Sequence, residues 1–318
     1  MTIKALPLAM RRAFLAHTGT LLAGGILASP LLLAQGAFAN SGAYEPQRGQ
    51  AGKDVIWIPS PDALVTRMLR LGAVTPRDYV IDLGSGDGKI VIAAAKEFGA
   101  QGKGIEYNPD MVELSKQRAQ AAGVADRAQF EKADIFESDF SQATVITMYL
   151  LPHLNLRLRH RILALKPGTR VVSHEFRMGR WAPDETSRVG TASVHLWLVP
   201  ANVGGEWQLT FPQRSGPATV SMEFSQTFQD FIGSVQFQDF STGVRESKVL
   251  GEQVHFSFTD EDGKLRRFEG QVVGDRITGS VFDGMSRAPF TAQRVGAAPA
   301  IAGSGPAPES EAESISAE

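Results

Sequence analysis

The residues of this chain best suited to chemistry form a glycine-rich loop between two acids. A run typical of a buried strand leads directly into Gly84, Ser85 and Gly86. The glycines allow the backbone to approach a ligand closely at the carboxyl end of that strand. Asp82 and Asp87 flank them, so an anion bound here would meet two carboxylates. The loop is therefore suited to a ligand that carries positive charge.

The class of ligand follows from the residues at the end of the loop. Dinucleotide-binding loops have a third glycine where Lys89 stands here, and they present a bare helix N-terminus to a pyrophosphate. Asp87 would place a carboxylate beside that pyrophosphate, which argues against a nicotinamide dinucleotide. S-adenosylmethionine carries a sulfonium and an ammonium and has no phosphate, so the acids of the loop are favourable or neutral neighbours. The sequence predicts S-adenosylmethionine as the cofactor.

Two further acids follow the next strands along the chain. Glu106 comes about twenty residues after the loop, where a carboxylate accepts hydrogen bonds from both hydroxyls of a ribose, and Tyr107 adjoins it. Asp134 is expected to accept from the exocyclic amine of adenine, while Ile135 or Phe136 covers the ring. A loop-capping aspartate is the alternative role for Asp134. These residues complete the predicted cofactor site.

Strand and helix patterns alternate along this part of the chain. Strands are expected over residues 78–83, 102–107, 129–133 and 143–149, and helices over residues 90–98 and 110–122. The alternation predicts an α/β fold with a doubly wound, Rossmann-like sheet. The fourth strand leads to Leu-Leu-Pro rather than to the Asn or Asp followed by Pro-Pro of enzymes that methylate planar amines. Bases and glutamine are therefore disfavoured as methyl acceptors.

Composition limits the partners. The 318 residues are 43% apolar, which is enough for two ordinary domains, and their net charge of -2 provides no broad positive field for a nucleic acid. The chain has no cysteine, which excludes disulfides and thiolate metal sites. His153 and His160 come closest to a metal pair, but solvated or capping roles suit them better. We expect neither nucleic-acid binding nor a metal.

Four segments together resemble a known family. They are Trp-Ile-Pro-Ser-Pro over residues 57–61, the glycine loop over 82–88, Tyr-Leu-Leu-Pro over 149–152 and Lys-Pro-Gly-Thr-Arg-Val-Val-Ser-His-Glu-Phe over 166–176. Their order and spacing are similar to those of the archaeal and mitochondrial protein-lysine methyltransferases, across residues 54–199. Mitochondrial members of that family act on the ATP synthase c subunit and the adenine nucleotide carrier. The glycine loop is shared by very many methyltransferases, whereas the first and last segments are more specific.

The resemblance implies a protein lysine as the methyl acceptor and assigns further site residues. Pro59 and Ser60 would help cover the cofactor, and Tyr149 and Glu175 would face the methyl group. Lysine must lose its proton before its nitrogen attacks, and Glu175, His174 or water would receive that proton. Strand-end residues packed under the cofactor are the alternative reading of Glu175 and His174.

The N-terminus predicts export. Lys4, Arg11 and Arg12 precede an apolar stretch, and Ala-Phe-Ala over residues 37–39 suits signal peptidase. The arginine pair resembles the twin-arginine signature. We expect an export signal over residues 1–39, a linker over 40–52, a periplasmic or otherwise exported mature protein with a cytoplasmic pool as alternative, and no membrane span after cleavage. A retained membrane anchor is the other reading of this segment.

The C-terminal half changes to strict alternation of apolar and polar residues, which indicates half-buried strands. Turn signals divide residues 206–294 into about eight strands, the count for a small antiparallel up-and-down barrel that we call lipocalin-like. Trp207 and Arg294 resemble the pair that closes the base of such barrels. The barrel domain is expected over residues 205–295, after a methyltransferase domain over 53–200. Its interior either holds one small apolar ligand or is filled by side chains.

The remaining residues, 296–318, have the composition of a disordered tail. Three functions compete at this point. The first is a methyltransferase that acts on protein lysines. The second is an exported binding protein that works through its barrel and keeps a vestigial methyltransferase domain, and the third is a small-molecule methyltransferase.

Overall fold

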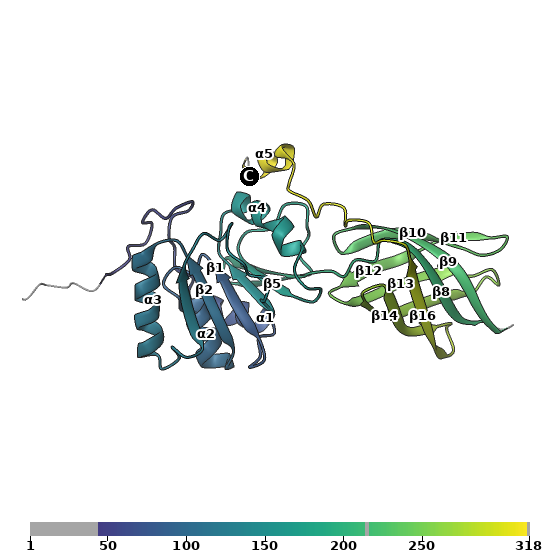
Figure 1. Ribbon diagram of the computed structural model, residues 1–318, viewed down its shortest axis with the longest axis horizontal. Helices are drawn as coiled ribbons and strands as arrows, with labels where there is room; N and C mark the ends of the chain where they lie inside the picture. The colour runs from purple at the N-terminus through teal and green to yellow at the C-terminus, as the bar shows by residue number, and fades with distance from the viewer. Residues whose placement is uncertain (1–43, 214–215, 317–318) are drawn as a thin grey trace, which may run out of the picture. The chain divides into compact units, whose positions relative to one another are not determined.

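The computed structural model describes residues 44–213 and 216–316 (Figure 1). The export signal expected over residues 1–39 lies outside these ranges. Within them the chain forms an α/β domain followed by a closed antiparallel β-barrel, which confirms the expected fold class. No helix in the described ranges is long and apolar enough to cross a membrane.

The first domain is built on a seven-stranded sheet with the order β3-β2-β1-β4-β5-β7-β6. Its strands are β1 (Tyr79–Leu83), β2 (Gln101–Glu106), β3 (Ala128–Lys132), β4 (Val145–Met148), β5 (Arg170–His174), β6 (Glu185–Val189) and β7 (Ala192–Leu198). The first five run parallel, and β7 joins β5 antiparallel. The chain winds from β1 outward to β3 and then returns to β4. The switch point, where doubly wound sheets bind ligands, therefore lies between β1 and β4.

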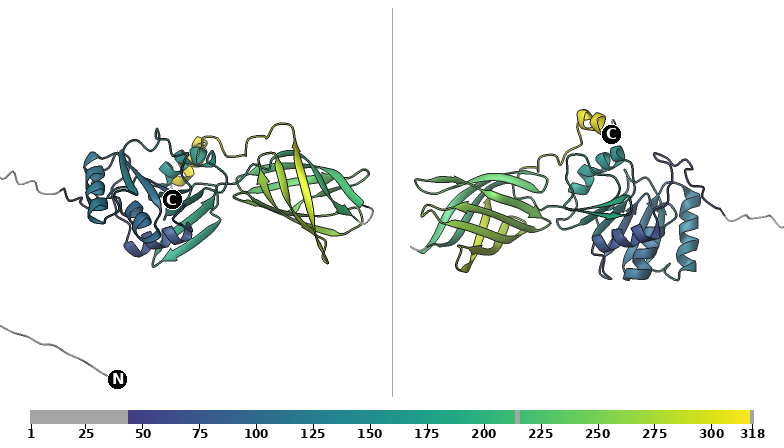
Figure 2. Two further views of the ribbon diagram at one scale, coloured as in Figure 1. Left: turned by 60° about the horizontal axis from the view of Figure 1, so that its bottom comes forward. Right: turned by 180° about the vertical axis from the view of Figure 1, so that it is seen from behind.

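Helices cover both faces of this sheet (Figures 1 and 2). They are α1 (Asp62–Leu71), α2 (Lys89–Phe98), α3 (Pro109–Ala121) and α4 (Pro152–Leu163). Successive side chains of a strand point to opposite faces. Val80 of β1 accordingly belongs to the core that contains Leu64 of α1 and Ala94 of α2, whereas Ile81 belongs to the core that contains Leu158 of α4. Both faces of β1 are buried, which explains its nearly continuous apolar run.

The second domain is an eight-stranded barrel with one short extra strand at its rim. Its strands are β8 (Gly205–Gln213), β9 (Gly216–Thr227), β10 (Asp230–Gln236), β12 (Arg245–Leu250), β13 (Gln253–Thr259), β14 (Leu265–Val273), β15 (Arg276–Phe282) and β16 (Arg287–Val295), and β11 (Ser241–Gly243) is the extra one. Neighbours in sequence pair antiparallel, and the pairing of β16 with β8 closes the barrel. Closure leaves no free edge among the eight strands.

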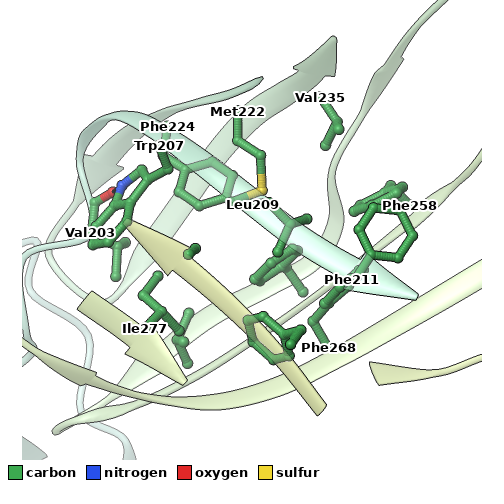
Figure 3. Packing of buried hydrophobic residues seen from close by; sticks show 14 of the residues in the cluster. Val203, Trp207, Leu209, Phe211, Met222, Phe224, Val235, Phe258, Phe268 and Ile277 are labelled. Atoms are coloured by element: carbon green, nitrogen blue, oxygen red, sulfur yellow. Dashed lines mark hydrogen bonds between the residues drawn. The ribbon is translucent and has the colours of Figure 1, made fainter. Parts of the chain in front are cut away.

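Aromatic rings fill the interior of the barrel (Figure 3). The ring centroid of Phe268 lies 4.8 Å from that of Phe256, 4.9 Å from that of Phe258 and 5.1 Å from that of Phe290. These are contact distances for packed aromatic side chains. Of the two alternatives for the interior, the packing supports the filled one, and a small apolar ligand in the barrel has no support.

Trp207 and Arg294, the pair expected to close the base of the barrel, pack against each other. The guanidinium carbon of Arg294 lies 4.2 Å from the ring centroid of Trp207. Arg294 also donates to the carbonyl oxygens of Asn202 and Gly204, while the indole N–H of Trp207 donates to the carbonyl oxygen of Val203 at 2.8 Å. The two side chains have no polar atom left facing a ligand, so their role is packing.

The expectation of a wholly disordered tail is wrong. A helix, α5 (Glu309–Ser316), follows the barrel and packs against α4. Its Glu311 is buried and accepts from both terminal nitrogens of Arg159, at 2.5 and 2.9 Å. This ion pair orders a segment whose composition alone favours disorder.

Candidate active site

A cleft opens at the carboxyl ends of the parallel strands, at the switch point. Its free volume is about 1330 Å³, its open mouth included. Most of the predicted cofactor residues line it: Pro59, Ser60, Asp82, Gly84, Ser85, Gly86, Asp87, Glu106, Tyr107, Asp134 and Ile135. Polar groups among apolar side chains, as in this lining, are typical of sites that bind small molecules.

The glycine loop has the geometry that its sequence requires. Gly84, Gly86 and Gly88 have φ angles of 79°, 53° and 78°, in the region that favours glycine. The amide N–H groups of Gly84 and Ser85 donate to the carbonyl oxygen of Ile105, at 2.9 and 3.0 Å, which ties the loop to β2. The loop is thereby held open at the end of β1.

Asp82 lies at the bottom of the cleft, almost completely buried. The hydroxyl of Thr147 donates to its Oδ1 at 2.7 Å. Burial raises the pKa of Asp82 to about 7, the bond from Thr147 works against that rise, and the charges of Asp87 and Glu106 add to it. Because no nearby positive charge among the described residues offsets the burial of this carboxylate, a cationic ligand would stabilise its ionised form.

Glu106 is held so that its carboxylate stays at the wall of the cleft. Its Oε2 accepts from the amide of Gly86 and its Oε1 from the amide of Asn108, each at 2.9 Å. Each oxygen retains a lone pair for a ribose hydroxyl. Asp87 differs, because its carboxylate pairs with Arg118 of α3 and so is partly neutralised. Asp87 therefore supports the loop more than it attracts a cation.

At the far end of the cleft, the amide of Phe136 donates to Oδ1 of Asp134 at 2.9 Å. The ammonium of Lys53 pairs with Oδ2, and this bond lowers the pKa of the carboxyl, although desolvation opposes the effect. Asp134 is thus both the expected loop cap and an acceptor facing the cleft. Tyr107 and Ile135 line the cleft, whereas the ring of Phe136 does not and lies 3.7 Å below the guanidinium of Arg157. Of the two candidates to cover adenine, only Ile135 lies in the wall of the cleft.

A short hairpin over residues 49–57, which we call the lid hairpin, covers the cleft. The amide of Gly49 donates to the carbonyl of Trp57 at 2.8 Å, and that of Trp57 to the carbonyl of Gln50 at 2.9 Å. A Cβ on Gly86 would lie 2.6 Å from Nε1 of Trp57, so the indole lies directly on the glycine loop. The expected linker over residues 40–52 is therefore wrong where it overlaps the hairpin, and this domain begins before Lys53.

Tyr149 marks the opposite end of the cleft from Asp134. Its ring centroid lies 3.7 Å from that of His174, and Nδ1 of His174 lies 3.0 Å from the hydroxyl of Ser60. His174 is buried, and this burial lowers its pKa. Tyr149 and Ser60 line the cleft but His174 does not. The structure thus places His174 behind the two residues that face the cavity.

Glu175 also lies outside the wall of the cleft. It has a φ angle of 66°, unusual for a residue with a side chain, and its carboxylate accepts from the amide of Ser193 at 2.9 Å. Nε2 of His195 lies 3.1 Å from its carbonyl oxygen. These bonds hold Glu175 against the hairpin of β6 and β7, which matches the alternative reading of a packed strand-end residue.

Several lining residues were not predicted from sequence. Lys53, Lys89 and Phe176 line the cleft together with Trp57 and Leu150. Trp57 and Phe176 belong to the segments that carry the family resemblance, so that signal was present. Lys53 belongs to no motif, and Lys89 ends the glycine loop without an assigned contact, so only the fold shows that both reach the cavity.

The side chains present fit S-adenosylmethionine. The acids Asp82, Glu106 and Asp134 follow one another along the cleft, where an ammonium, a ribose and an adenine amine each need an acceptor. Bound there, the cofactor supplies an electrophilic methyl group on a sulfonium. Apolar and aromatic side chains line the cleft around Tyr149, the end where that methyl group would be transferred. In the described ranges no three His, Asp or Glu side chains gather closely enough to hold a metal.

Comparisons with known proteins identify a methyltransferase domain in this chain. The family model of the ANTKMT methyltransferase domain matches residues 82–185. The protein-lysine N-methyltransferase of Saccharolobus islandicus is 43% identical over 151 residues, which are 46% of this chain and 94% of the archaeal protein. A Mus musculus protein, named as the lysine N-methyltransferase of the ATP synthase c subunit, is 38% identical over 44% of this chain, but the match spans only 55% of the mouse protein.

Among solved structures, an RNA methyltransferase from Salinibacter ruber in complex with S-adenosyl-L-homocysteine is 50% identical over 46% of this chain and 96% of its own, with a TM-score of 0.45. The residues that the family model matches lie within the α/β domain. The chain belongs to the family of S-adenosylmethionine-dependent methyltransferases that includes the archaeal protein-lysine N-methyltransferase.

Proposed function

We propose that this enzyme transfers methyl groups to lysine side chains of a protein. The observation that carries the proposal is the chemistry at the acceptor end of the cleft. Tyr149, Leu150, Leu151 and Phe176 line it, and none of them is the Asn or Asp acceptor that would orient a planar amine. A long, flexible alkylamine fits such a lining, and the 43% identical archaeal relative bears the name of this activity.

The lining also suits the protonation state that the reaction needs. The C–S bond to the methyl group breaks as a C–N bond forms, and the nitrogen needs a free lone pair. An apolar slot disfavours the ammonium form of lysine and so lowers its pKa. The proton leaves to water or to an oxygen at the mouth. Because His174 lies outside the cleft wall and contacts both Tyr149 and Ser60, we assign it to their positioning. Glu175 is bonded instead to the hairpin of β6 and β7.

A labelling experiment tests the proposal. Radiolabelled S-adenosylmethionine is incubated with a cell-envelope extract and the full chain, beside the variants Asp82→Ala and Asp126→Ala. Asp126 is exposed on a loop remote from the cleft, so its variant is a matched control. We expect label in a protein band with wild type and with the control, lost with Asp82→Ala, and methyllysine in its peptides by mass spectrometry.

The competing functions give other outcomes. Label confined to small molecules would make the enzyme a small-molecule methyltransferase, and label in nucleic acid would make it a methyltransferase of RNA or DNA. An absence of label in every fraction would favour a binding protein that acts through its barrel. Each of these results overturns the assignment to protein lysine.

We further propose that the mature chain is exported. The basic residues, the apolar stretch and the Ala-Phe-Ala end of residues 1–39 support this proposal. Fractionation of cells that express the full chain tests it, beside a variant with Arg11→Lys and Arg12→Lys. We expect mature protein in the periplasmic fraction for wild type only. Equal distribution of the two proteins would contradict the twin-arginine assignment.

A further inference from the structure

Lys89 lines the cleft and has no role in the site described above. It is the first residue of α2, directly after the glycine loop. Its ammonium nitrogen lies 3.1 Å from the carbonyl oxygen of Ser60 and 2.8 Å from Oδ1 of Asp62. The side chain of Asp62 is 89% exposed, so water and salt screen this ion pair strongly. Lys89 is therefore free to exchange Asp62 for another anion.

The charges of the cleft leave one part of the cofactor without a partner. S-adenosylmethionine carries a single anionic group, the carboxylate of its amino-acid end. Of the described residues that line the cleft, only Lys53 and Lys89 are cationic, whereas five are acidic. Lys53 pairs with Asp134, and a carboxylate placed beside Asp134 would be repelled. Lys89 is the cation that remains.

The order of strands places Lys89 at the correct end. Asp134 follows β3 and Glu106 ends β2, so adenine and ribose lie over the β3 and β2 side of the cleft. The amino-acid end must then point past β1, toward Asp82 and the start of α2. Ser60, whose carbonyl Lys89 contacts, lies there too. We propose that Lys89 binds the carboxylate of the cofactor's amino-acid end.

Two ligands of different length isolate this contact. S-adenosylhomocysteine contains the amino-acid end, whereas 5′-methylthioadenosine lacks it, and calorimetry on the full chain measures the Kd of each. Loss of a charge-assisted hydrogen bond costs a factor of about ten or more in affinity. We expect Lys89→Met to weaken S-adenosylhomocysteine by that factor and to leave 5′-methylthioadenosine unchanged.

Matched variants complete the experiment. Lys96→Met changes an exposed lysine two turns further along α2 and should bind both ligands as wild type does. Lys89→Arg should retain most of the affinity, because it keeps the charge. If Lys89→Met is poorly folded, as judged by its Tm, Lys89→Gln replaces it. Equal weakening of both ligands, or unchanged binding of S-adenosylhomocysteine, overturns the proposal, and either result leaves the assignment of S-adenosylmethionine intact.

Discussion

At the scale of single residues, Asp82 links cofactor binding to pH. Its pKa of about 7 means that about half of the cofactor-free molecules carry a neutral carboxyl at neutral pH. A cationic ligand favours the ionised form, so binding must release a proton below that pH. Affinity should consequently rise with pH until Asp82 is fully ionised.

We expect S-adenosylhomocysteine to bind wild type about tenfold more tightly at pH 8 than at pH 6, relative to Asp82→Asn in the same buffers. The ratio to the variant removes the titration of the ligand's own amine. Isothermal calorimetry measures both constants. A ratio that does not change with pH would show that Asp82 is already ionised in the free protein.

The same residue makes a prediction about stability. The ordinary pKa of an aspartate, 3.8, applies to the unfolded chain, whereas the folded value is about 7. Between these values the folded protein holds a proton that the unfolded chain has released, so stability of the cofactor-free protein falls as pH rises from about 4 to about 7. Asp82→Asn should therefore have the higher Tm at pH 8 and little advantage at pH 4. A lower Tm for the variant at pH 8 would refute this sign.

The affinity of the variant Glu106→Ala for the cofactor product tests the contact between Glu106 and the ribose. Both of its oxygens are preset by backbone amides, so Glu106→Ala removes an oriented acceptor and also frees the amide of Gly86. Hydrogen bonds to a charged group contribute about 1.5 to 3 kcal/mol, which corresponds to at least a tenfold loss of affinity. Calorimetry with S-adenosylhomocysteine measures it. Unchanged binding would remove Glu106 from the cofactor site.

The sequence predicts which residues line the cleft where their place follows from the backbone. Asp82 and Glu106 lie at the carboxyl ends of β1 and β2, and Asp134 follows β3, and the ends of parallel strands meet at one edge of a sheet. Prediction failed where a side chain's direction matters. Glu175 has a positive φ angle, and its carboxylate accepts from the amide of Ser193. No local sequence pattern predicts a positive φ angle at this position.

At the scale of elements, the lid hairpin forms one wall of the cleft. Lys53 at its tip pairs with Asp134 and lies 4.9 Å from the ring centroid of Tyr107, while Trp57 at its base lies on the glycine loop. The sequence pattern assigned the first four residues of this hairpin, 49–52, to a linker, because they are too short a run for a periodic pattern. Its partners are distant in sequence, so only the fold brings them together.

Trp57→Ala should accelerate release of the cofactor, since the indole is the largest side chain between the glycine loop and the lid hairpin. We expect the dissociation rate of S-adenosylhomocysteine to rise about tenfold in stopped-flow fluorescence, the cost of losing part of one buried aromatic contact. Ile56→Ala is the comparison, because Ile56 lies beside Trp57 on the same hairpin and lines the cleft but is 53% exposed. Equal effects of the two variants would show that the hairpin as a whole, rather than Trp57, retains the ligand.

At the scale of the whole molecule, the barrel and the tail differ in how far sequence predicts them. Alternation with period two marked the barrel strands, because each has one face in the core and one in solvent. The alternation could not tell a filled interior from a ligand site, since both need apolar residues. The tail was misjudged for another reason: one buried ion pair between residues far apart in sequence outweighs a disorder-prone composition.

That ion pair leads to a prediction about acid stability. Pairing with Arg159 lowers the pKa of Glu311 below its ordinary 4.5, although desolvation opposes the shift. The pair therefore stabilises the folded state above pH about 4.5, and the contribution is lost as pH falls through the folded value. Glu311→Gln leaves the guanidinium of Arg159, which is 1% exposed, without its counter-charge. Removing one member of a buried pair costs about 3 to 5 kcal/mol of stability. The net loss is smaller here, because α5 can detach and leave Arg159 hydrated.

We expect Glu311→Gln to lower the free energy of unfolding by about 1 to 3 kcal/mol at pH 7, measured by urea titration, and the difference from wild type to shrink as the pH is lowered. Hydrogen exchange should show α5 losing protection first. Glu309→Gln, on the exposed first turn of the same helix, controls for the loss of one negative charge. If both variants unfold as wild type does, the contact between α5 and α4 contributes nothing to stability, and the tail behaves as its composition suggests.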